Sequence, residues 1–403
     1  MKMLLIYPPF APPTIMSYSL ANLKSLIENN SHMETLAIDL NAKFHKLSHL
    51  DTVEKIDKAM PIYEKNNRKI LEGGTPEFFD DFIKLIKDEK PDYVALSILY
   101  STQCFYAQKL IENIDCPVFI GGPGVSANLS GIKINSGEEL LDVFGIKDKT
   151  CSGPDFGDFD ARDYISPHIN VVKSSQGCYY GMCSFCSHHK KKPYRELPLD
   201  FKEGGYFYFI DDMLPLKRLM RIALEIPENS KWWVQLRPTK DLIPNLKYFS
   251  EKGLKSVAWG VESGSQEILD RMNKGTVVDD MSMVLKEAKE AGIVNTVYIM
   301  FGFPGETEKD FLKTVDFLKK NEEFIDLVST SVFGLQKGTE IYENPEKFGI
   351  KLNIEKRTIL DEKITFYPMP ESLRLKKSYN HEIDRINKFP KFYVHLKEQT
   401  LFL

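Results

Sequence analysis

The chain has 403 residues, of which 42% are hydrophobic and 27% charged, and a formal net charge of −4. This composition is that of an ordinary globular protein with room for two or three domains, and the slight negative charge gives no general attraction to nucleic acid or anionic lipid. No apolar run reaches about 18 residues, so we expect neither a membrane span nor a signal peptide. Six cysteines, three of them clustered, do not resemble a disulfide framework, which favours a reducing cytoplasm.

The first 150 residues alternate strand-like and helix-like segments. The predicted strands are Lys2–Tyr7, Glu34–Asp39, Asp92–Ser97 and Pro117–Ile120. The predicted helices are Ser17–Glu28, insertions within 43–75, Glu77–Lys87 and Gln103–Ile114. This alternation predicts a doubly wound parallel sheet, a fold that binds ligands at the carboxyl ends of its strands.

A Gly-, Pro- and Asp-rich stretch at 151–169 predicts a linker, and a second β/α series follows it to residue 334. Its predicted strands are Val171–Ser174, Tyr206–Ile210, Trp232–Leu236, Ser256–Val261, Thr296–Phe301 and Leu327–Val332. Its predicted helices are Pro215–Glu225, Gln266–Met272, Met281–Ala291 and Glu308–Asn321. About six parallel strands suit an incomplete (β/α)6 barrel, because a full eight-fold barrel needs about 250 residues. Residues 335–403 are Lys-rich and predict a small cap or extension.

Three cysteines, Cys178, Cys183 and Cys186, follow the first predicted strand of this series with the spacing C-x4-C-x2-C. Three thiolates can hold three irons of a [4Fe–4S] cluster and leave the fourth iron open to bind and reduce a small molecule. The alternative is a zinc ion, which favours four ligands, so that His188 or His189 would have to supply the fourth.

With an aromatic residue before its last cysteine, this motif resembles that of the radical S-adenosylmethionine (SAM) superfamily, although the usual first gap is one residue shorter. The resemblance covers about residues 170–335 and includes Phe209-Ile-Asp-Asp212, Trp259-Gly-Val-Glu-Ser-Gly-Ser-Gln266 and Phe301-Gly-Phe-Pro-Gly-Glu306. It implies a [4Fe–4S] cluster, an external electron donor such as ferredoxin or flavodoxin, and SAM. We expect the SAM contacts at Phe185, Asp211, Asp212, Arg237, Glu262, Ser263, Gly302 and Pro304. For Arg237, at a strand end, binding of a carboxylate and a structural salt bridge are equal alternatives.

Two elements of the first 150 residues, Ser97-Ile-Leu99 and Gly121-Gly122, resemble the Ser-x-Leu and Gly-Gly elements of cobalamin-binding domains. Glycine permits the close backbone approach that a cobalamin tail needs. The usual histidine motif that ligates cobalt is missing, and a Pro-Pro element follows the first strand instead. The resemblance implies cobalamin contacts at Pro8, Pro9, Ser97, Leu99, Tyr100, Gln103, Gly121, Gly122, Pro123 and Glu138. Tyr100 and Gln103 are candidates for the group below the cobalt, with helix capping or a core role as the alternative.

Together these resemblances imply a cobalamin-dependent radical SAM C-methyltransferase. Its expected domains are a Rossmann-like cobalamin-binding domain (1–150), a linker (151–169), a partial barrel (170–334) and a C-terminal cap (335–403). A 5′-deoxyadenosyl radical would abstract hydrogen from an unactivated carbon, which would then take a methyl group from methylcobalamin. The substrate would be a small molecule or a polypeptide, for example a glutamine of methyl-coenzyme M reductase.

Two other interpretations stay open. A cobalamin-binding radical SAM enzyme can catalyse a rearrangement or cyclisation without net methylation. Alternatively, the N-terminal sheet only binds a partner, and the barrel acts alone as a methylthiolase-like or tRNA-modifying enzyme. A methylthiolase needs a second cluster, for which Cys104, Cys116 and Cys151 are widely scattered, and no basic aromatic stripe indicates RNA binding.

Overall fold

The computed structural model describes residues 1–403 except 57, 151–152, 188–192, 202 and 391. The described chain forms two compact units. The N-terminal unit comprises Met1–Pro167 together with Lys356–Lys363, and the C-terminal unit comprises His168–Glu355 and Ile364–Leu403. In the part of the chain that is described, no helix is both long enough and apolar enough to cross a membrane.

The N-terminal unit is built on a five-stranded parallel sheet with strand order β2-β1-β3-β4-β5. The strands are β1 Lys2–Tyr7, β2 Glu34–Asp39, β3 Tyr93–Ser97, β4 Val118–Gly121 and β5 Ile132–Ile134. In the centre of the sheet, Leu4 of β1 lies opposite Leu36 on one side and Val94 on the other. Continuous apolar runs such as β1 suit a parallel sheet because both of its faces are covered.

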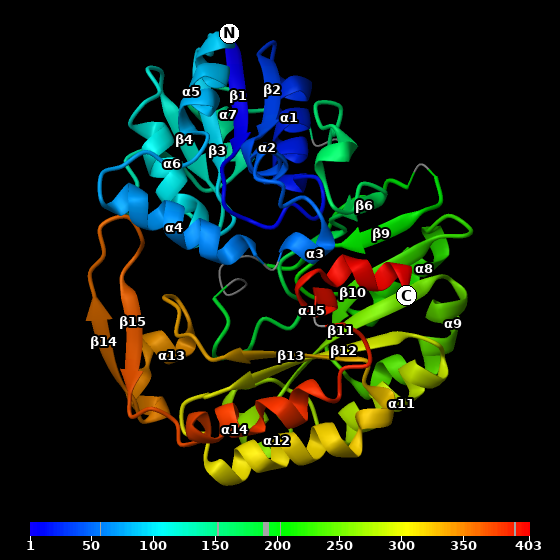
Figure 1. Cartoon of the computed structure of the whole chain (residues 1–403). Coiled ribbons are helices and arrows are strands. Elements are labelled where there is room, and N and C mark those ends of the chain that lie inside the picture. Colours follow the sequence, from blue (N-terminus) through cyan, green and yellow to red (C-terminus); the bar gives the residue numbers. More distant parts are fainter. Residues whose placement is uncertain (57, 151–152, 188–192, 202, 391) are drawn as a thin grey trace. The chain divides into compact units, whose positions relative to one another are not determined.

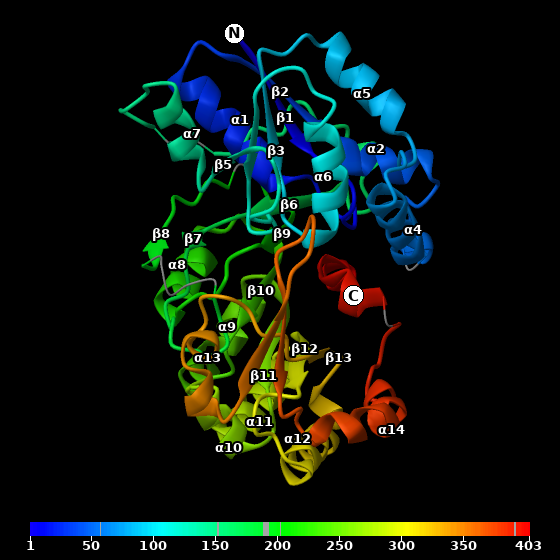
Figure 2. The same cartoon turned by 90° about the vertical axis from the view of Figure 1, so that its left-hand side faces the viewer.

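Helices cover both faces of this sheet (Figure 2), which confirms the doubly wound prediction. On one face lie α1 Tyr18–Asn30 and α7 Gly137–Val143. The opposite face carries α2 Leu40–Leu47, α5 Phe79–Asp88 and α6 Cys104–Ile111, with α4 Ala59–Leu71 packed on α6. Shorter helical segments are α3 Val53–Ile56, η1 Ser101–Gln103 and η2 Ala161–Asp163. Helix α7 begins at Gly137, and Ser136 caps it by accepting a hydrogen bond from the backbone N–H of Glu139.

The C-terminal unit contains a six-stranded parallel sheet with strand order β13-β12-β11-β10-β9-β6, which confirms the incomplete barrel. Its strands are β6 Ile169–Val172, β9 Tyr206–Phe209, β10 Lys231–Leu236, β11 Leu254–Glu262, β12 Val294–Phe301 and β13 Leu327–Val332. The connecting helices are α8 Leu216–Glu225, η3 Lys240–Asn245, α9 Leu246–Glu251, α10 Gln266–Arg271, α11 Val278–Glu290, α12 Glu308–Lys320 and η4 Glu322–Phe324. Figure 1 shows α8, α9, α11 and α12 along the outside of the sheet, where their apolar faces share one core with the strands.

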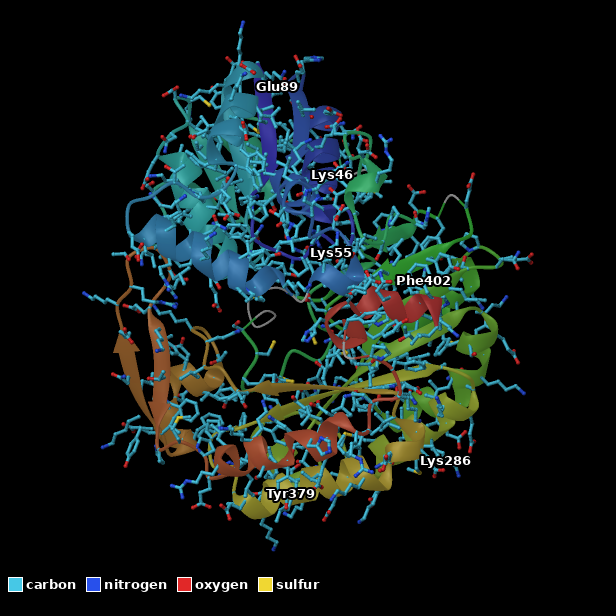
Figure 3. The ribbon with its side chains drawn as sticks, viewed as in Figure 1. Lys46, Lys55, Glu89, Lys286, Tyr379 and Phe402 are labelled. Carbon is cyan, nitrogen blue, oxygen red and sulfur yellow. The ribbon has the colours of Figure 1, made fainter. Side chains whose placement is uncertain are left out.

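The residues after the barrel form more secondary structure than a simple cap. They comprise α13 Glu340–Glu343, η5 Pro345–Phe348, the two-stranded sheet of β14 Lys351–Glu355 and β15 Lys363–Tyr367, α14 Ser372–Asp384, α15 Phe392–His395 and η6 Lys397–Phe402. Helix α14 packs on α12, where the ring of Tyr379, labelled in Figure 3, lies 5.5 Å from that of Phe311. Helix α14 is therefore part of the barrel unit's core.

Candidate functional site

The loop that carries the three cysteines is closed at its base by a small antiparallel pair of strands. β7 (Ser175–Gln176) pairs with β8 (Arg195–Glu196), and the side chain of Arg195 donates to that of Gln176 at 2.6 Å. Arg218 of α8, which is almost fully buried, donates to the backbone oxygens of Ser174 and Leu197 at 2.7 and 2.5 Å. One guanidinium group therefore holds both ends of the cysteine loop.

The middle of the same loop docks on the turn that follows α10. The backbone N–H of Ser184 donates to the carbonyl of Met272 at 2.9 Å, and the Tyr180 hydroxyl donates to the carbonyl of Asn273 at 2.8 Å. In return, the side-chain amide of Asn273 donates to the carbonyl of Met182 at 2.9 Å. These bonds fix the backbone between the first two cysteines, the gap in which one residue is added to the usual spacing.

All three cysteines line one cavity of about 410 Å³ in the C-terminal unit. The other lining residues come from the cysteine loop, from strands β9, β10 and β11 and their carboxyl ends, and from the C-terminus: Tyr180, Phe185, Tyr208, Phe209, Ile210, Asp211, Asp212, Met213, Trp233, Gln235, Arg237, Glu262, Lys274 and Lys397. Burial raises the pKa of the Cys183 thiol to about 11. A bound cluster would have to stabilise this sulfur as a thiolate.

The donor set fits a [4Fe–4S] cluster. Within the described ranges, no group of three His, Cys, Asp or Glu side chains is placed to hold a single metal ion. In a cubane each thiolate binds a different iron, so the three sulfurs need only border the same space, as they do here. His188 and His189, the alternative zinc ligands, lie outside the described residues.

Arg237 holds the cysteine loop and the turn after α10 together. Its guanidinium group donates to the backbone oxygens of Lys274 and Gly275 at 2.7 and 2.8 Å, and it stacks over the ring of Tyr180 with 3.6 Å between the guanidinium carbon and the ring centroid. Its Nη1 also contacts the Tyr179 hydroxyl at 3.4 Å. The structure thus gives Arg237 backbone carbonyl partners, while its buried Nε has no partner among the described residues.

Glu262 ends β11 with a backbone conformation that L-residues rarely adopt. Its φ is +66°, and the register between β11 and β12 shifts at this residue. Its carboxylate forms an ion pair with Lys274, with 2.7 Å between Oε1 and Nζ, and both side chains are largely buried. Backbone strain of this kind concentrates at functional sites. The pair therefore presents one fixed carboxylate to the cavity.

Asp211 and Asp212 follow β9, and the hydrogen bonds of Asp211 give it a structural role. Asp211 is buried and accepts hydrogen bonds from the backbone N–H of Ser174 and from the Ser175 hydroxyl, at 3.1 and 2.5 Å. Burial raises its pKa, and these hydrogen bonds oppose the rise. Asp211 therefore ties β9 to the entry of the cysteine loop, and both it and Asp212 border the cavity.

Three of the expected SAM-contact residues are absent from the described lining of the cavity. Ser263 is fully buried and lies 3.1 Å from the Thr314 hydroxyl of α12. Gly302, with φ +82°, donates its backbone N–H to Glu306 at 2.6 Å, and Pro304 lies in the same turn. These residues shape the carboxyl ends of β11 and β12, whereas Phe185 reaches the cavity directly.

Replacing Arg237 with methionine is expected to loosen the cysteine loop without removing a ligand. Hydrogen bonds to charged groups contribute about 1.5–3 kcal/mol, so the free energy of unfolding should fall by about that amount. The variant should also lose iron faster than wild type when a chelator is added, which visible absorption would follow. Arg374→Met, at an exposed position of α14 in the same unit, is the matched control. Equal iron loss in wild type and Arg237→Met would contradict this role.

In the N-terminal unit, the predicted Ser-x-Leu and Gly-Gly elements contact each other. Gly122 has φ +113°, and a Cβ at this position would lie 2.3 Å from the carbonyl oxygen of Ile98. The backbone N–H of Gly124 donates to the same oxygen at 3.0 Å. The turn after β4 therefore lies directly on the turn after β3, and only glycine permits this approach.

The Pro-Pro segment after β1 is held by side chains from two other elements, η1 and α2. The Gln103 amide donates to the carbonyl of Pro8 at 2.6 Å, and Thr102 donates to that of Phe10 at 2.8 Å. Asn41 accepts from the backbone N–H of Ala11 at 2.8 Å. Gln103 also accepts from the backbone of Leu99 and of Tyr100, at 2.8 and 3.0 Å. Gln103 is fully buried and takes part in the capping box of η1. Its contacts are those of a core and capping residue, which was the alternative to a position below the cobalt.

The remaining cobalamin candidates lie on the carboxyl side of the sheet or beside it. The Ser97 hydroxyl lies 2.8 Å from that of Ser19 on α1, and the Tyr100 side chain is 52% exposed. Pro123 belongs to the glycine turn, and Pro9 to the segment after β1. Glu138 lies in the first turn of α7 and accepts Lys149 through its backbone oxygen at 2.6 Å.

The cavity residues that the sequence did not single out include Tyr208, Trp233, Lys274 and Lys397. Lys274 lies at the end of the Ile-Leu-Asp-Arg-Met-Asn-Lys run after β11, so its position in that run was a usable signal. Tyr208 and Trp233 occupy strand positions where an aromatic residue usually indicates a core role. Lys397 lies in a lysine-rich C-terminal segment, and no motif around it indicates a functional role.

The fold and the cysteine-lined cavity define a radical SAM protein, and sequence comparison agrees. The family model described as "Radical SAM superfamily" matches residues 204–318. A tRNA-2-methylthio-N(6)-dimethylallyladenosine synthase of Fusobacterium nucleatum is 37% identical over 72% of this chain and 71% of its own length. The chain belongs to the radical SAM superfamily, whose cofactors are a [4Fe–4S] cluster and SAM.

A second relative covers a similar share of the chain, and two solved structures cover more of it. An uncharacterized methyltransferase of Pyrococcus horikoshii, PH0819, is 25% identical over 71% of this chain and 76% of its own length. The cobalamin-dependent SAM radical enzyme OxsB, solved with aqua-cobalamin and SAM, superposes with a TM-score of 0.64 at 15% identity, over 100% of this chain and 72% of its own. The radical SAM methyltransferase TsrM of Kitasatospora setae also gives 0.64, at 14% identity, over 94% of this chain and 88% of its own. The chain thus has the fold of these enzymes.

Proposed function

We propose that the protein is a cobalamin-dependent radical SAM C-methyltransferase. The observation that carries the cobalamin part is the contact of Gly122 with Ile98, because it leaves the carboxyl edge of the N-terminal sheet without side chains at that point. Doubly wound sheets bind ligands at this edge. The likeness to OxsB and TsrM, whose structures contain cobalamin, supports the same assignment.

Each group of cavity residues would have its own task in this reaction. When bound, the cluster, SAM and cobalamin supply an electron, a 5′-deoxyadenosyl radical and a methyl group. Cys178, Cys183 and Cys186 would hold the cluster, and Arg237 would keep their loop in place. Glu262, oriented by Lys274, would accept hydrogen bonds from SAM. The electron would come from an external donor such as ferredoxin or flavodoxin.

A methylthiolase-like activity is the second candidate, favoured by the 37% identical synthase of Fusobacterium nucleatum. That chemistry would need a second cluster. Of the remaining cysteines, Cys104 is buried and donates its thiol to the carbonyl of Gly124 at 3.0 Å, Cys116 is half-buried, and Cys151 lies outside the described residues. Cys104 is thus committed to the glycine turn, which favours the methyltransferase.

The finer proposal concerns the substrate. The cavity of about 410 Å³ would have to hold the cluster and SAM and also admit the reacting group, which favours a compact group such as a small molecule or a single side chain of a polypeptide. A glutamine of methyl-coenzyme M reductase is one target of this size. A non-methylating rearrangement would use the same cavity and would differ in its products.

Cofactor content is the direct test of the proposal. After anaerobic purification and reconstitution with hydroxocobalamin, we expect about four irons and one cobalt per chain. Turnover should then give 5′-deoxyadenosine and S-adenosylhomocysteine together with a methylated product. Four irons without cobalt would reject the methyltransferase, and deoxyadenosine without S-adenosylhomocysteine would indicate the rearrangement.

A further inference from the structure

The C-terminal segment is an integral part of the barrel unit. Thr400 is fully buried and donates a hydrogen bond to the Ser256 hydroxyl of β11 at 2.9 Å. The ring of Phe402, labelled in Figure 3, lies 4.8 Å from that of Tyr206 on β9. Leu396 and Leu401 are almost fully buried, and Figure 1 shows the segment beside β10. Segment 396–402 therefore has a fixed place against the strands.

Because the segment is anchored in this way, Lys397 lies at the cavity that the cysteines line. Lys397 lines the same cavity as the three cysteines, although they are far apart in the sequence. Its ammonium group lies 4.6 Å from the ring centroid of Tyr298 on β12, within the range of a cation–π contact. Burial lowers the pKa of this lysine, and the neighbouring Glu398 opposes the shift.

Lys397 approaches the cavity from the amino-terminal side of the strands. Thr400 of its segment contacts Ser256, six residues before Glu262 on β11, and Phe402 contacts Tyr206 at the start of β9. Trp233 lies opposite Ser256 in the register of β10 and β11, and its ring stacks on that of Tyr208 at 4.5 Å. Tyr298 lies opposite Gly260, close to the level of Glu262.

Two side chains on these strands carry hydrogen-bond donors without acceptors. Among the described residues, neither the Trp233 indole N–H nor the Tyr298 hydroxyl has a hydrogen-bond partner. Of the three cavity cations, Arg237 is engaged by carbonyls and Lys274 by Glu262. The ion pairs found in the described ranges include none with Lys397.

Burying donors and a cation without acceptors costs free energy, which a ligand that brings oxygen acceptors recovers. We infer that Lys397 is a specificity-determining residue that binds a carboxylate of the substrate in the cavity. The inference rests on the proposed function, since it assigns a substrate class to the same site. It predicts a substrate whose reacting carbon is tethered to a carboxylate.

Small probes can test this inference before the substrate is known. The full-length reconstituted protein, without SAM, is treated anaerobically with formaldehyde and cyanoborohydride, and dimethylation of each lysine is followed by peptide mass spectrometry. Acetate at twice its dissociation constant should slow the modification of Lys397 about threefold, by simple occupancy. Acetamide, which has the same shape without the charge, should leave the rate unchanged. The exposed Lys377 of α14 is the internal control.

A second measurement separates substrate binding from SAM binding. In Lys397→Met and Lys397→Arg, iron content should match wild type and the affinity for SAM should stay within about twofold. Once a substrate is found, its KM should rise in Lys397→Met and be partly restored in Lys397→Arg. Equal protection by acetamide, no protection by acetate, or an about tenfold loss of SAM affinity in Lys397→Met would overturn the inference. Cobalt content is measured separately, so failure of the cobalamin proposal would be recognised as such.

Discussion

Replacing Cys178, Cys183 and Cys186 together with alanine is expected to abolish both the [4Fe–4S] absorption and the reductive cleavage of SAM. The three thiols border one cavity and are the cysteines on the loop held by Arg218. Without thiolates, the irons would have no strong protein ligands there, and SAM would have no open iron to bind. Iron content should fall from about four per chain to near zero, and 5′-deoxyadenosine should no longer form with dithionite.

The matched control is Cys116→Ala, because Cys116 is half-buried in the N-terminal unit, away from the cysteine loop in sequence. This variant should keep its iron and its SAM cleavage. Circular dichroism should show that the triple variant retains its helices, since no cysteine of the loop belongs to the buried core. Iron and SAM cleavage that persist in the triple variant would show that the cluster assignment is wrong.

The strands were predictable from the sequence because parallel strands are buried on both faces. Lys2–Tyr7 and Glu34–Asp39 were predicted to the residue. Leu327–Val332 was also predicted to the residue, from its β-branched residues, although only its first two residues are buried. Strand β14, by contrast, was not predicted, because most of its side chains are exposed and it has no apolar pattern. The short β5 was missed for the same reason.

The site was predictable where its residues are neighbours in sequence. The cysteine spacing and the segment around Glu262 are local patterns, and both led to residues that line the cavity. Lys397 reaches that cavity only through tertiary packing of Thr400 and Leu401, which no local pattern records. Arg237 was foreseen at the right strand end, but the backbone carbonyls it binds could be identified only in the structure.

Replacing Gly122 with leucine is expected to abolish cobalamin binding while leaving the iron content unchanged. Any Cβ at this position meets the carbonyl of Ile98, a backbone atom that cannot rotate away. The turn after β4 would have to move, and the added side chain would enter the predicted position of the cobalamin tail. Strain at a left-handed residue should also cost about 1–3 kcal/mol of stability. Cobalt per chain after reconstitution is the measurement.

Gly145 provides the control for backbone strain alone. It has φ +76° in the same unit, and a Cβ there would meet no atom within 4 Å. Gly145→Leu should therefore carry a similar conformational cost and still bind about one cobalt per chain. Gly121→Ala is a milder test, because its Cβ would approach the Ile134 carbonyl at 3.1 Å. Stoichiometric cobalt in Gly122→Leu would remove the glycine turn from the binding site and, with it, the observation on which the cobalamin proposal depends.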